Sequence, residues 1–370
     1  MTKDFLVEQC SRWPGLEPQD LLKALYQSVF GCGHFVGEGG EGRLLAELGD
    51  LTSDLPDWGV EPLDGPYCRF HLRHLAAAGL RPETLYRLFF LSAQAPRGTE
   101  EALEEKLLAL LEAAQAGGLP WTYEKVAAAV KAWREQGFPS VQHSQALLQL
   151  CRPAYRVLRK EFIWMLPLLA AIDRLLETQG GGIVAIDGCS AAGKSTLARC
   201  LQRLYDCEVY HMDDFFLRPE QRTERRLQEA GGNVDRERFM EQVLLPVSRG
   251  EPVSLRRYDC KTDTLSAPEE HAPKALTIVE GAYAAHPALA WRYDLAAYVH
   301  LDENTQRERI LRRNGEEEQR LFFERWIPLE KAYFEGTRIE KRCDLSLEAG
   351  EVAQEREEAE APVEEGRQSR

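Results

Sequence analysis

The sequence predicts an α/β protein in which a parallel sheet flanked by helices forms the second half of the chain, preceded by an all-α region. Three observations support this division. After residue 180, short apolar runs typical of strands alternate with helical segments, as in parallel sheets. Before residue 155, apolar residues recur at the spacing of amphipathic helices. Three consecutive glycines at 180–182 separate the two patterns and predict a hinge.

Length and composition limit the classes of protein to consider. With 370 residues the chain is long enough for two domains. It has no run of about 18 apolar residues and no secretory pattern at its N-terminus, so we expect no membrane association. Nine cysteines without a CxxC pair predict reduced thiols and a cytoplasmic location. A net charge of −14 argues against nucleic acid as a partner. The oligomeric state is left open.

Residues 1–155 are expected to form the helical domain, whose role the sequence does not reveal. Leucines at 103–111 fall on one helical face, and residues 123–133 repeat the pattern. His34, among three glycines, could be a ligand or catalytic residue or part of a helix-joining loop. The segment Arg152–Arg156 (RPAYR) could reach the second domain's site or pack at the junction. The last feature is a C-x2-H-x2-H spacing, which we expect on a helix surface because no further ligand pair for a metal is evident; its residues are Cys68, His71 and His74.

The second domain is expected at 156–347. A helix over 155–177 leads to the hinge, and a Gly-rich turn after the first strand opens a helix at 194–204. The predicted strands are 183–187, 208–212, 275–280 and 295–301. The remaining residues, 348–370, carry eight Glu and three Arg, a net charge of −5, and predict a disordered acidic tail.

The motif GCSAAGKS at 188–195 matches the phosphate-binding P-loop pattern GxxxxGK[ST], with a strand before it and a helix after it. Gly188 and Gly193 allow backbone N–H groups to turn toward phosphate oxygens. Lys194 is expected to neutralise the β- and γ-phosphates, and the Ser195 hydroxyl to ligate Mg²⁺. The motif therefore predicts ATP and Mg²⁺ as cofactors, although it does not separate ATP from GTP. The expected nucleotide contacts are Gly188, Cys189, Ser190, Ala191, Ala192, Gly193, Lys194, Ser195 and Thr196.

Two aspartates follow the second predicted strand, in the segment 210–216 (YHMDDFF). In an open parallel sheet, that strand end faces the ligand crevice beside the P-loop. A carboxylate there can accept the proton of a substrate hydroxyl as the hydroxyl attacks the γ-phosphate. The alternative is that Asp213 and Asp214 cap a loop. With no guanine-reading segment and no transporter signature, the pattern favours a kinase for a small hydroxyl compound.

Four arginines, Arg307, Arg309, Arg312 and Arg313, follow the strand 295–301 on an expected helix. Arginine suits a lid over a transferring phosphoryl group because its planar fork binds oxygens in pairs and stays charged. The alternative is a solvated helix face, since glutamates surround the group.

The ordered set IDGCSAAGKST, HMDDFF, NVD at 233–235, RRYD at 256–259 and IVEG at 278–281 resembles the uridine kinase family. Phosphoribulokinase, pantothenate kinase and nicotinamide riboside kinase are related to this family. The resemblance covers residues 180–347, about half of the chain. It implies a P-loop NTPase-type fold and an ATP-dependent phosphotransferase that acts on the hydroxyl of a nucleoside-like acceptor.

The resemblance also implies roles for individual residues. Asp213 would be the general base, with Asp214 beside it among the substrate contacts. Asp235 would hold ribose-type hydroxyls, and Tyr258 would line the substrate pocket. Glu280 would support the Mg²⁺ shell through water. The lid over the phosphates would be formed by Arg309, Arg312 and Arg313.

One departure from the family concerns the acceptor. After Tyr258-Asp259 the uridine kinases of this family carry phenylalanine and then His and Arg, whereas this chain has CKTDTL at 260–265. The alternatives are therefore a kinase for pantothenate, a sugar phosphate or a vitamin riboside. From a different class, a non-catalytic ATP-binding regulator is the remaining alternative.

Overall fold

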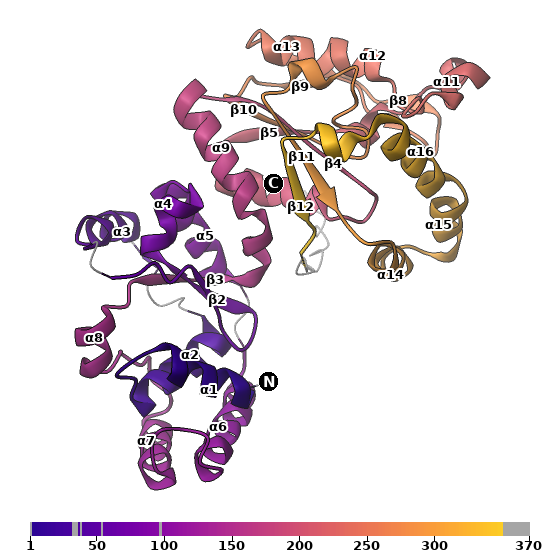
Figure 1. The fold of residues 1–370 in the computed structure, drawn as a ribbon. Coiled ribbons are helices and arrows are strands. Elements are labelled where there is room, and N and C mark those ends of the chain that lie inside the picture. The colour runs from indigo at the N-terminus through magenta and orange to yellow at the C-terminus, as the bar shows by residue number, and fades with distance from the viewer. Residues whose placement is uncertain (1, 32–35, 38, 53–54, 96–97, 351–370) are drawn as a thin grey trace, which may run out of the picture.

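The structure is a computed structural model that describes residues 2–31, 36–37, 39–52, 55–95 and 98–350 (Figure 1). No helix among these residues is long and apolar enough to span a bilayer. His34 and most of the predicted acidic tail, from residue 351 onward, lie outside the described residues. The first residue of that predicted tail, Glu348, ends a strand instead.

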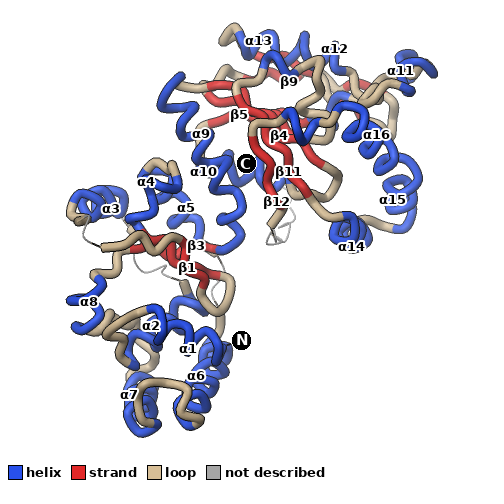
Figure 2. Tube along the Cα trace, in the orientation of Figure 1, coloured by secondary structure: helices blue, strands red, loops and turns tan. Residues whose placement is uncertain are grey.

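The second half of the chain contains a five-stranded, all-parallel sheet with the strand order β12-β11-β4-β10-β5 (Figure 2). The four predicted strands are confirmed, and together with the P-loop they give the predicted P-loop NTPase-type fold. The fifth strand, β12, was not predicted. The strands are β4 (Gly182–Gly188), β5 (Cys207–His211), β10 (Leu276–Glu280), β11 (Leu295–His300) and β12 (Leu345–Glu348).

The central strand β4 is apolar on both faces because both faces are covered. Successive side chains of a strand point to opposite sides. Val184 and Ile186 join a core that includes Leu197 of α10 (Lys194–Leu204). Ile183 and Ala185 join a second core with Phe239 and Val243. A continuous apolar run is the pattern expected of such a doubly covered parallel strand.

The helices divide between these two faces (Figure 1). One face carries α9 (Leu166–Gln179) and α10. The other carries α12 (Arg236–Phe239), the π-helical turn Met240–Leu244, α13 (Leu245–Ser248) and α16 (Ile327–Thr337). An arm of α14 (Glu303–Arg313), α15 (Glu316–Leu321) and the π-helical turn Phe322–Trp326 leads into α16. Smaller elements outside the sheet are α11 (Glu224–Gln228) and the strand pairs β6 (Val253–Leu255) with β9 (Glu269–His271) and β7 (Tyr258–Asp259) with β8 (Thr264–Leu265).

The N-terminal half is mainly helical, as predicted, but it is not all-α. Its helices are α1 (Thr2–Arg12), α2 (Pro18–Phe30), α3 (Gly40–Gly49), α4 (Leu75–Ala78), α5 (Pro82–Gln94), α6 (Glu100–Gln115), α7 (Tyr123–Glu135) and α8 (Gln145–Cys151). A three-stranded antiparallel sheet joins β1 (Val60–Pro62), β2 (Tyr67–His71) and β3 (Tyr155–Arg159). The sequence did not reveal this sheet because its strands have only three to five residues, which is too short for a clear period.

The expected helix over 155–177 therefore begins later. Residues 155–159 form β3, a 3-10 turn spans Lys160–Met165, and α9 starts at Leu166. The domain division at residue 155 stays a prediction, and β3, just beyond it, pairs with β2 of the first half.

A buried contact ties the N-terminal half to the helix that follows the P-loop. Asp173 of α9 accepts hydrogen bonds from the backbone of Arg81 (2.8 Å), from Thr84 (2.7 Å) and from Tyr205 at the end of α10 (2.9 Å). Arg87 of α5 donates to the carbonyl of Leu204. One hydrophobic core runs through both halves at this point, so α10 is anchored at its C-terminal end by the N-terminal region.

Candidate active site

The P-loop leaves β4 with backbone angles that favour glycine. Gly188, Ala191 and Gly193 have φ values of 146°, 61° and 92°. A Cβ atom at Gly188 would lie 2.4 Å from the carbonyl oxygen of Val299 on β11, so only glycine fits there. Gly193 is the residue before α10, which places the positive end of the helix dipole at the loop. The loop thus has the geometry to bind an anionic phosphate group.

Lys194 and Ser195 are the first two residues of α10. The ammonium group of Lys194 donates to the carbonyl of Cys189 (2.8 Å), which holds the side chain back along the loop. The Ser195 hydroxyl donates to Oε1 of Glu280 at the end of β10 (3.0 Å). The two residues predicted to support Mg²⁺, Ser195 and Glu280, are therefore adjacent. Both have side-chain oxygens, the kind of ligand that Mg²⁺ prefers.

His211, at the end of β5, completes this corner of the site. Its Nδ1 lies 2.5 Å from Oε1 of Glu280. Burial alone would raise the pKa of Glu280, but the hydrogen bond from His211 and the charge of Lys194 hold that pKa below its ordinary value. The hydrogen bond to Glu280 in turn raises the pKa of His211. His211 was not among the predicted site residues, although it lies at the same strand end as Asp213.

The two aspartates after β5 have different surroundings. Asp213 is exposed to solvent in the 3-10 turn Met212–Phe215 that follows β5. Desolvation by the surrounding protein raises its pKa, and so do the nearby carboxylates of Glu280 and Asp214. The positive charge of Lys194 has the opposite effect. Asp214 instead pairs with Arg257 (3.5 Å). Of the two, Asp213 is the one left accessible to a substrate.

The arm after β11 touches the P-loop through α14. Gln306 donates to the carbonyl of Ser190 (3.1 Å), and Arg309 donates to the carbonyl of Ala191 (3.2 Å). Arg312 and Arg313 are exposed on the last turn of α14. The structure thus brings Arg309 to the loop, while Arg312 and Arg313 do not contact it.

Glu330 of α16 is a residue of the site that the sequence did not reveal. It is 4% exposed and accepts two hydrogen bonds from Ser190, one from the backbone N–H (3.0 Å) and one from the hydroxyl. Burial raises its pKa, and the charge of Lys194 opposes this. A glutamate among apolar helix residues carries no motif, so only the packing of α16 against the loop identifies it.

Replacing Glu330 by Ala is expected to destabilise the protein by about 1–3 kcal/mol, because the half-buried N–H of Ser190 loses its acceptor. Calorimetric unfolding of the variant and of the unaltered protein measures the difference. Ser190→Ala is the matched control, since it removes one hydroxyl bond and leaves the backbone bond in place. A Glu330→Ala variant that unfolds no more easily than Ser190→Ala would contradict this assignment.

Tyr258 and Asp235, two of the predicted substrate residues, lie near a groove of about 520 Å³ that is lined by residues of the segments 216–233 and 260–263 and of the arm. Tyr258 donates to Asp263 and accepts from Arg222 (2.6 Å), and both partners line the groove. Asp235 is 1% exposed, caps α12 through the N–H of Arg238 (3.1 Å) and pairs with the Arg238 guanidinium. It is therefore engaged within the protein, and Asn233 is the member of the NVD segment that lines the groove.

The residues singled out in the first half lie apart from this site. Cys68 and His71 belong to the buried strand β2, and His74 to a 3-10 turn, so the expected helix surface is wrong. Within the described ranges, no group of three or more His, Cys, Asp or Glu residues could hold a metal ion. Of the RPAYR segment, Tyr155 joins a buried polar cluster of the N-terminal half and Arg156 pairs with Glu47 (2.7 Å).

Comparison with known proteins finds similarity in structure only. No protein-family model and no curated protein matches the chain. A possible uridine kinase from Bacillus stearothermophilus is 23% identical over 48% of this chain and 98% of its own, with a TM-score of 0.37. A putative fructose transport system kinase from Silicibacter sp. TM1040 is 22% identical over 48% and 94%, with a TM-score of 0.35. Shikimate kinase from Bacteroides thetaiotaomicron is 14% identical over 45% and 85%, with a TM-score of 0.24.

These similar structures cover about half of this chain. All three are named as kinases. At this level of similarity the fold assignment depends on the chain's own five-stranded parallel sheet and phosphate loop. On that geometry, the second half of the chain has the P-loop NTPase fold.

Proposed function

We propose that the second half of the chain is a small-molecule kinase that transfers the γ-phosphate of ATP to a hydroxyl of a nucleoside-like acceptor. The observation that carries this proposal is the placement of Asp213. Its exposed carboxylate stands at the carboxyl end of β5, close enough to Lys194 and Glu280 for their charges to act on its pKa. A phosphate loop and an accessible base in one cleft are the two parts that hydroxyl phosphorylation needs.

The residues present fit ATP and Mg²⁺. The N–H groups of the loop and Lys194 would hold the phosphates, and Ser195 would ligate the metal with Glu280 behind it through water. Bound Mg²⁺ supplies positive charge that offsets the charge developing on the phosphoryl oxygens. His211 and Ser195 both bond Oε1 of Glu280, which orients the carboxylate before any ligand arrives.

Asp213 orients the acceptor hydroxyl and takes its proton during transfer. A raised pKa makes a carboxylate a stronger base. Arg309 already contacts the P-loop, and we propose that Arg312 and Arg313 approach the phosphoryl group when the arm closes. In this proposal the P-loop binds ATP, the phosphate donor, and Asp213 and the groove bind the acceptor.

The groove supports a planar acceptor. Phe216 and Trp326 both line the groove, and their rings contact each other with centroids 5.4 Å apart and planes tilted by 31°. Asn233 and the Arg222–Asp263 pair add hydrogen-bonding groups at the same wall. A volume of about 520 Å³ suits a small molecule of nucleoside size. Sugar phosphates, pantothenate and vitamin ribosides remain the competing acceptors.

Trp326→Ala is expected to raise the KM for the acceptor about tenfold and leave the KM for ATP within about twofold, because an aromatic wall contributes about 1–1.5 kcal/mol to a stacked ring. Steady-state kinetics with each substrate varied in turn makes this measurement. Trp291→Ala is the control, since that exposed tryptophan lies outside the groove. Equal changes in both KM values would argue against the groove as the acceptor site.

ADP release with and without added acceptors tests the proposal as a whole. We expect turnover only when a compound from a panel of nucleosides, vitamin ribosides, pantothenate and sugar phosphates is present. Tight ATP binding without turnover on any compound would instead support the non-catalytic regulator. As a kinase of small metabolites with predicted reduced thiols, the protein is proposed to act in the cytoplasm.

A further inference from the structure

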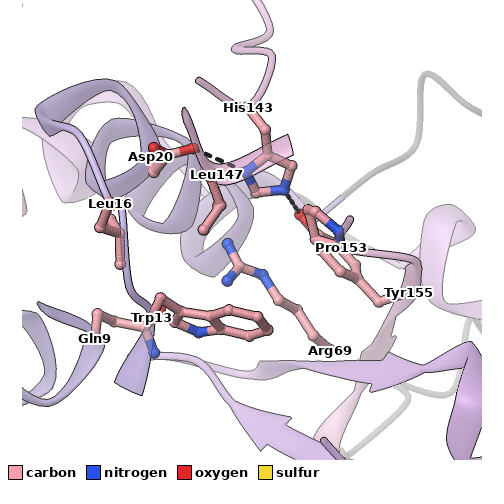
Figure 3. A pocket seen from close by; sticks show the side chains of 9 residues that line it. All are labelled: Gln9, Trp13, Leu16, Asp20, Arg69, His143, Leu147, Pro153 and Tyr155. Atoms are coloured by element: carbon pink, nitrogen blue, oxygen red, sulfur yellow. Dashed lines mark hydrogen bonds and ion pairs between the residues drawn. The ribbon is translucent and has the colours of Figure 1, made fainter. Parts of the chain in front are cut away.

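A buried polar cluster in the N-terminal half has no part in the proposed kinase chemistry (Figure 3). It is built where α1, α2, the sheet and the segment 143–155 meet. Asp20, Glu61, Arg69 and His71 are each less than 5% exposed. Four ionisable side chains buried together away from the kinase cleft therefore require a separate explanation.

Asp20, His143 and Tyr155 form a continuous hydrogen-bonded line. Oδ1 of Asp20 lies 2.9 Å from Nδ1 of His143, and Nε2 of His143 lies 2.7 Å from the Tyr155 hydroxyl. Burial alone would raise the pKa of Asp20, but bonds from His143 and Ser144 hold it below its ordinary value. Burial lowers the pKa of His143. A neutral imidazole fits this arrangement: it donates to Asp20 through Nδ1 and accepts a hydrogen bond from the Tyr155 hydroxyl at Nε2, while the Gln27 amide donates to the same hydroxyl (3.2 Å).

Arg69 is held beside this line by a second carboxylate. Its Nε donates to Gln27 (2.9 Å), its Nη1 lies 3.5 Å from Glu61, and its guanidinium carbon lies 4.8 Å from the centre of the Tyr155 ring. Glu61 stands opposite Arg69 across the β1–β2 pair and also accepts from Gln9 (2.7 Å) and Trp13 (3.1 Å). These contacts fix the direction in which the guanidinium points.

The guanidinium extends into a small cavity. Figure 3 shows it between the ring of Trp13 and the Asp20–His143 pair, with Leu16 and Leu147 beyond it. The cavity has about 10 Å³, enough for one water-sized group. Tyr155, Leu16 and Pro153 line it and are only half-buried, so one side of the cavity is near solvent. A ligand could place one polar group inside and rest its remainder on these three residues.

A network that served stability alone would not need these groups. Replacing buried ion pairs by apolar residues is often neutral or stabilising, because taking charges out of water costs several kcal/mol per ion. Perturbed ionisable groups that line a cavity are instead characteristic of functional sites. Here a fixed cation and the end of an Asp–His–Tyr line both reach the same cavity.

We propose that this cavity is a second ligand site, separate from the kinase cleft, for a small compound that bears an anionic oxygen next to a hydroxyl group. Arg69 binds the anionic oxygen, and Tyr155 binds the hydroxyl. The anionic oxygen belongs to a carboxylate or a phosphate, both of which match the guanidinium fork. The Asp20–His143 pair positions the Tyr155 hydroxyl.

Titration calorimetry on the full-length protein tests this, with L-lactate, acetate, inorganic phosphate and 2-propanol as probes. L-lactate has a carboxylate and a hydroxyl, acetate and 2-propanol have one group each, and phosphate tests the other anion. We expect L-lactate to bind at least tenfold more tightly than acetate or 2-propanol. Tyr155→Phe should remove that advantage, and Arg69→Lys should weaken every anion at least tenfold. Tighter binding of phosphate than of L-lactate, with the same dependence on Arg69, identifies a phosphate compound.

Two controls separate this site from the rest of the molecule. Arg73→Lys changes an arginine just beyond β2 that does not line the cavity, and it should leave binding unchanged. Lys194→Ala removes the phosphate contact of the kinase cleft and should also leave binding of L-lactate unchanged. Failure of all three anions to bind the folded, unaltered protein would overturn the proposal, as would anion binding that is unaffected in both Arg69→Lys and Tyr155→Phe.

Discussion

Asp213→Asn is expected to lower kcat by about 10² or more while the Kd for ATP changes less than about threefold. The amide has the shape of the carboxylate but cannot accept the acceptor's proton, and general-base catalysis contributes factors of this size. The side chain faces solvent in the cleft and makes no hydrogen bond to the P-loop within the described residues, so nucleotide binding should survive. Single-turnover phosphoryl transfer and equilibrium ATP binding measure the two quantities separately.

Asp214→Asn is the matched control for this prediction. Asp214 pairs with Arg257, so its loss should affect the position of that arginine more than proton transfer. A near-normal rate in Asp213→Asn together with a large loss in Asp214→Asn would move the role of general base to Asp214.

The same residue sets the expected pH dependence. Asp213 must be ionised to act as a base, and its pKa is raised above that of an ordinary aspartate by desolvation and by Glu280 and Asp214. The value of kcat/KM should therefore fall as the pH drops through this raised pKa, at a pH above about 4, the ordinary value for aspartate. In Asp213→Asn this acid limb should be absent.

Lys194→Ala is expected to weaken ATP binding by about 10- to 100-fold and to lower kcat further, because a charge-assisted hydrogen bond to a phosphate contributes about 1.5–3 kcal/mol. Lys194 is 8% exposed and is held against the carbonyl of Cys189, so its ammonium group is already within the loop. Calorimetric titration with a non-hydrolysable ATP analogue gives the affinity, and the rate of ADP formation gives the activity.

Lys194→Arg separates charge from shape in this test. It keeps the positive charge but brings a larger planar group into the loop, so we expect partial affinity and a strongly reduced rate. Undiminished ATP binding in Lys194→Ala would mean that the loop does not hold the triphosphate.

The sequence predicted those parts of the molecule that are encoded locally. The P-loop is one continuous segment whose glycine positions and following helix are fixed by neighbouring residues, and α10 begins and ends where predicted. The four longer strands appear as apolar runs because both faces of the sheet are buried. Asp213 could be found because the end of β5 has a known relation to the loop in parallel sheets.

The parts that the sequence did not predict depend on contacts between distant segments. β3 pairs with β2, and the partners in this antiparallel register lie 84 to 92 residues apart in the chain, the pair Tyr67–Arg159 being the most distant. Glu330 reaches Ser190 across 140 residues. The Asp20–His143 pair joins segments 123 residues apart. Such pairings follow from tertiary packing and leave no periodicity or motif in a single sequence.

Transfer of ³²P from γ-labelled ATP to a small-molecule extract tests the central claim most directly. The account predicts that label moves into an organic product, that the transfer requires Mg²⁺, and that Asp213→Asn and Lys194→Ala both suppress it. Label that stays in ATP, or that appears only as inorganic phosphate with or without the extract, would contradict phosphoryl transfer to an acceptor at this cleft.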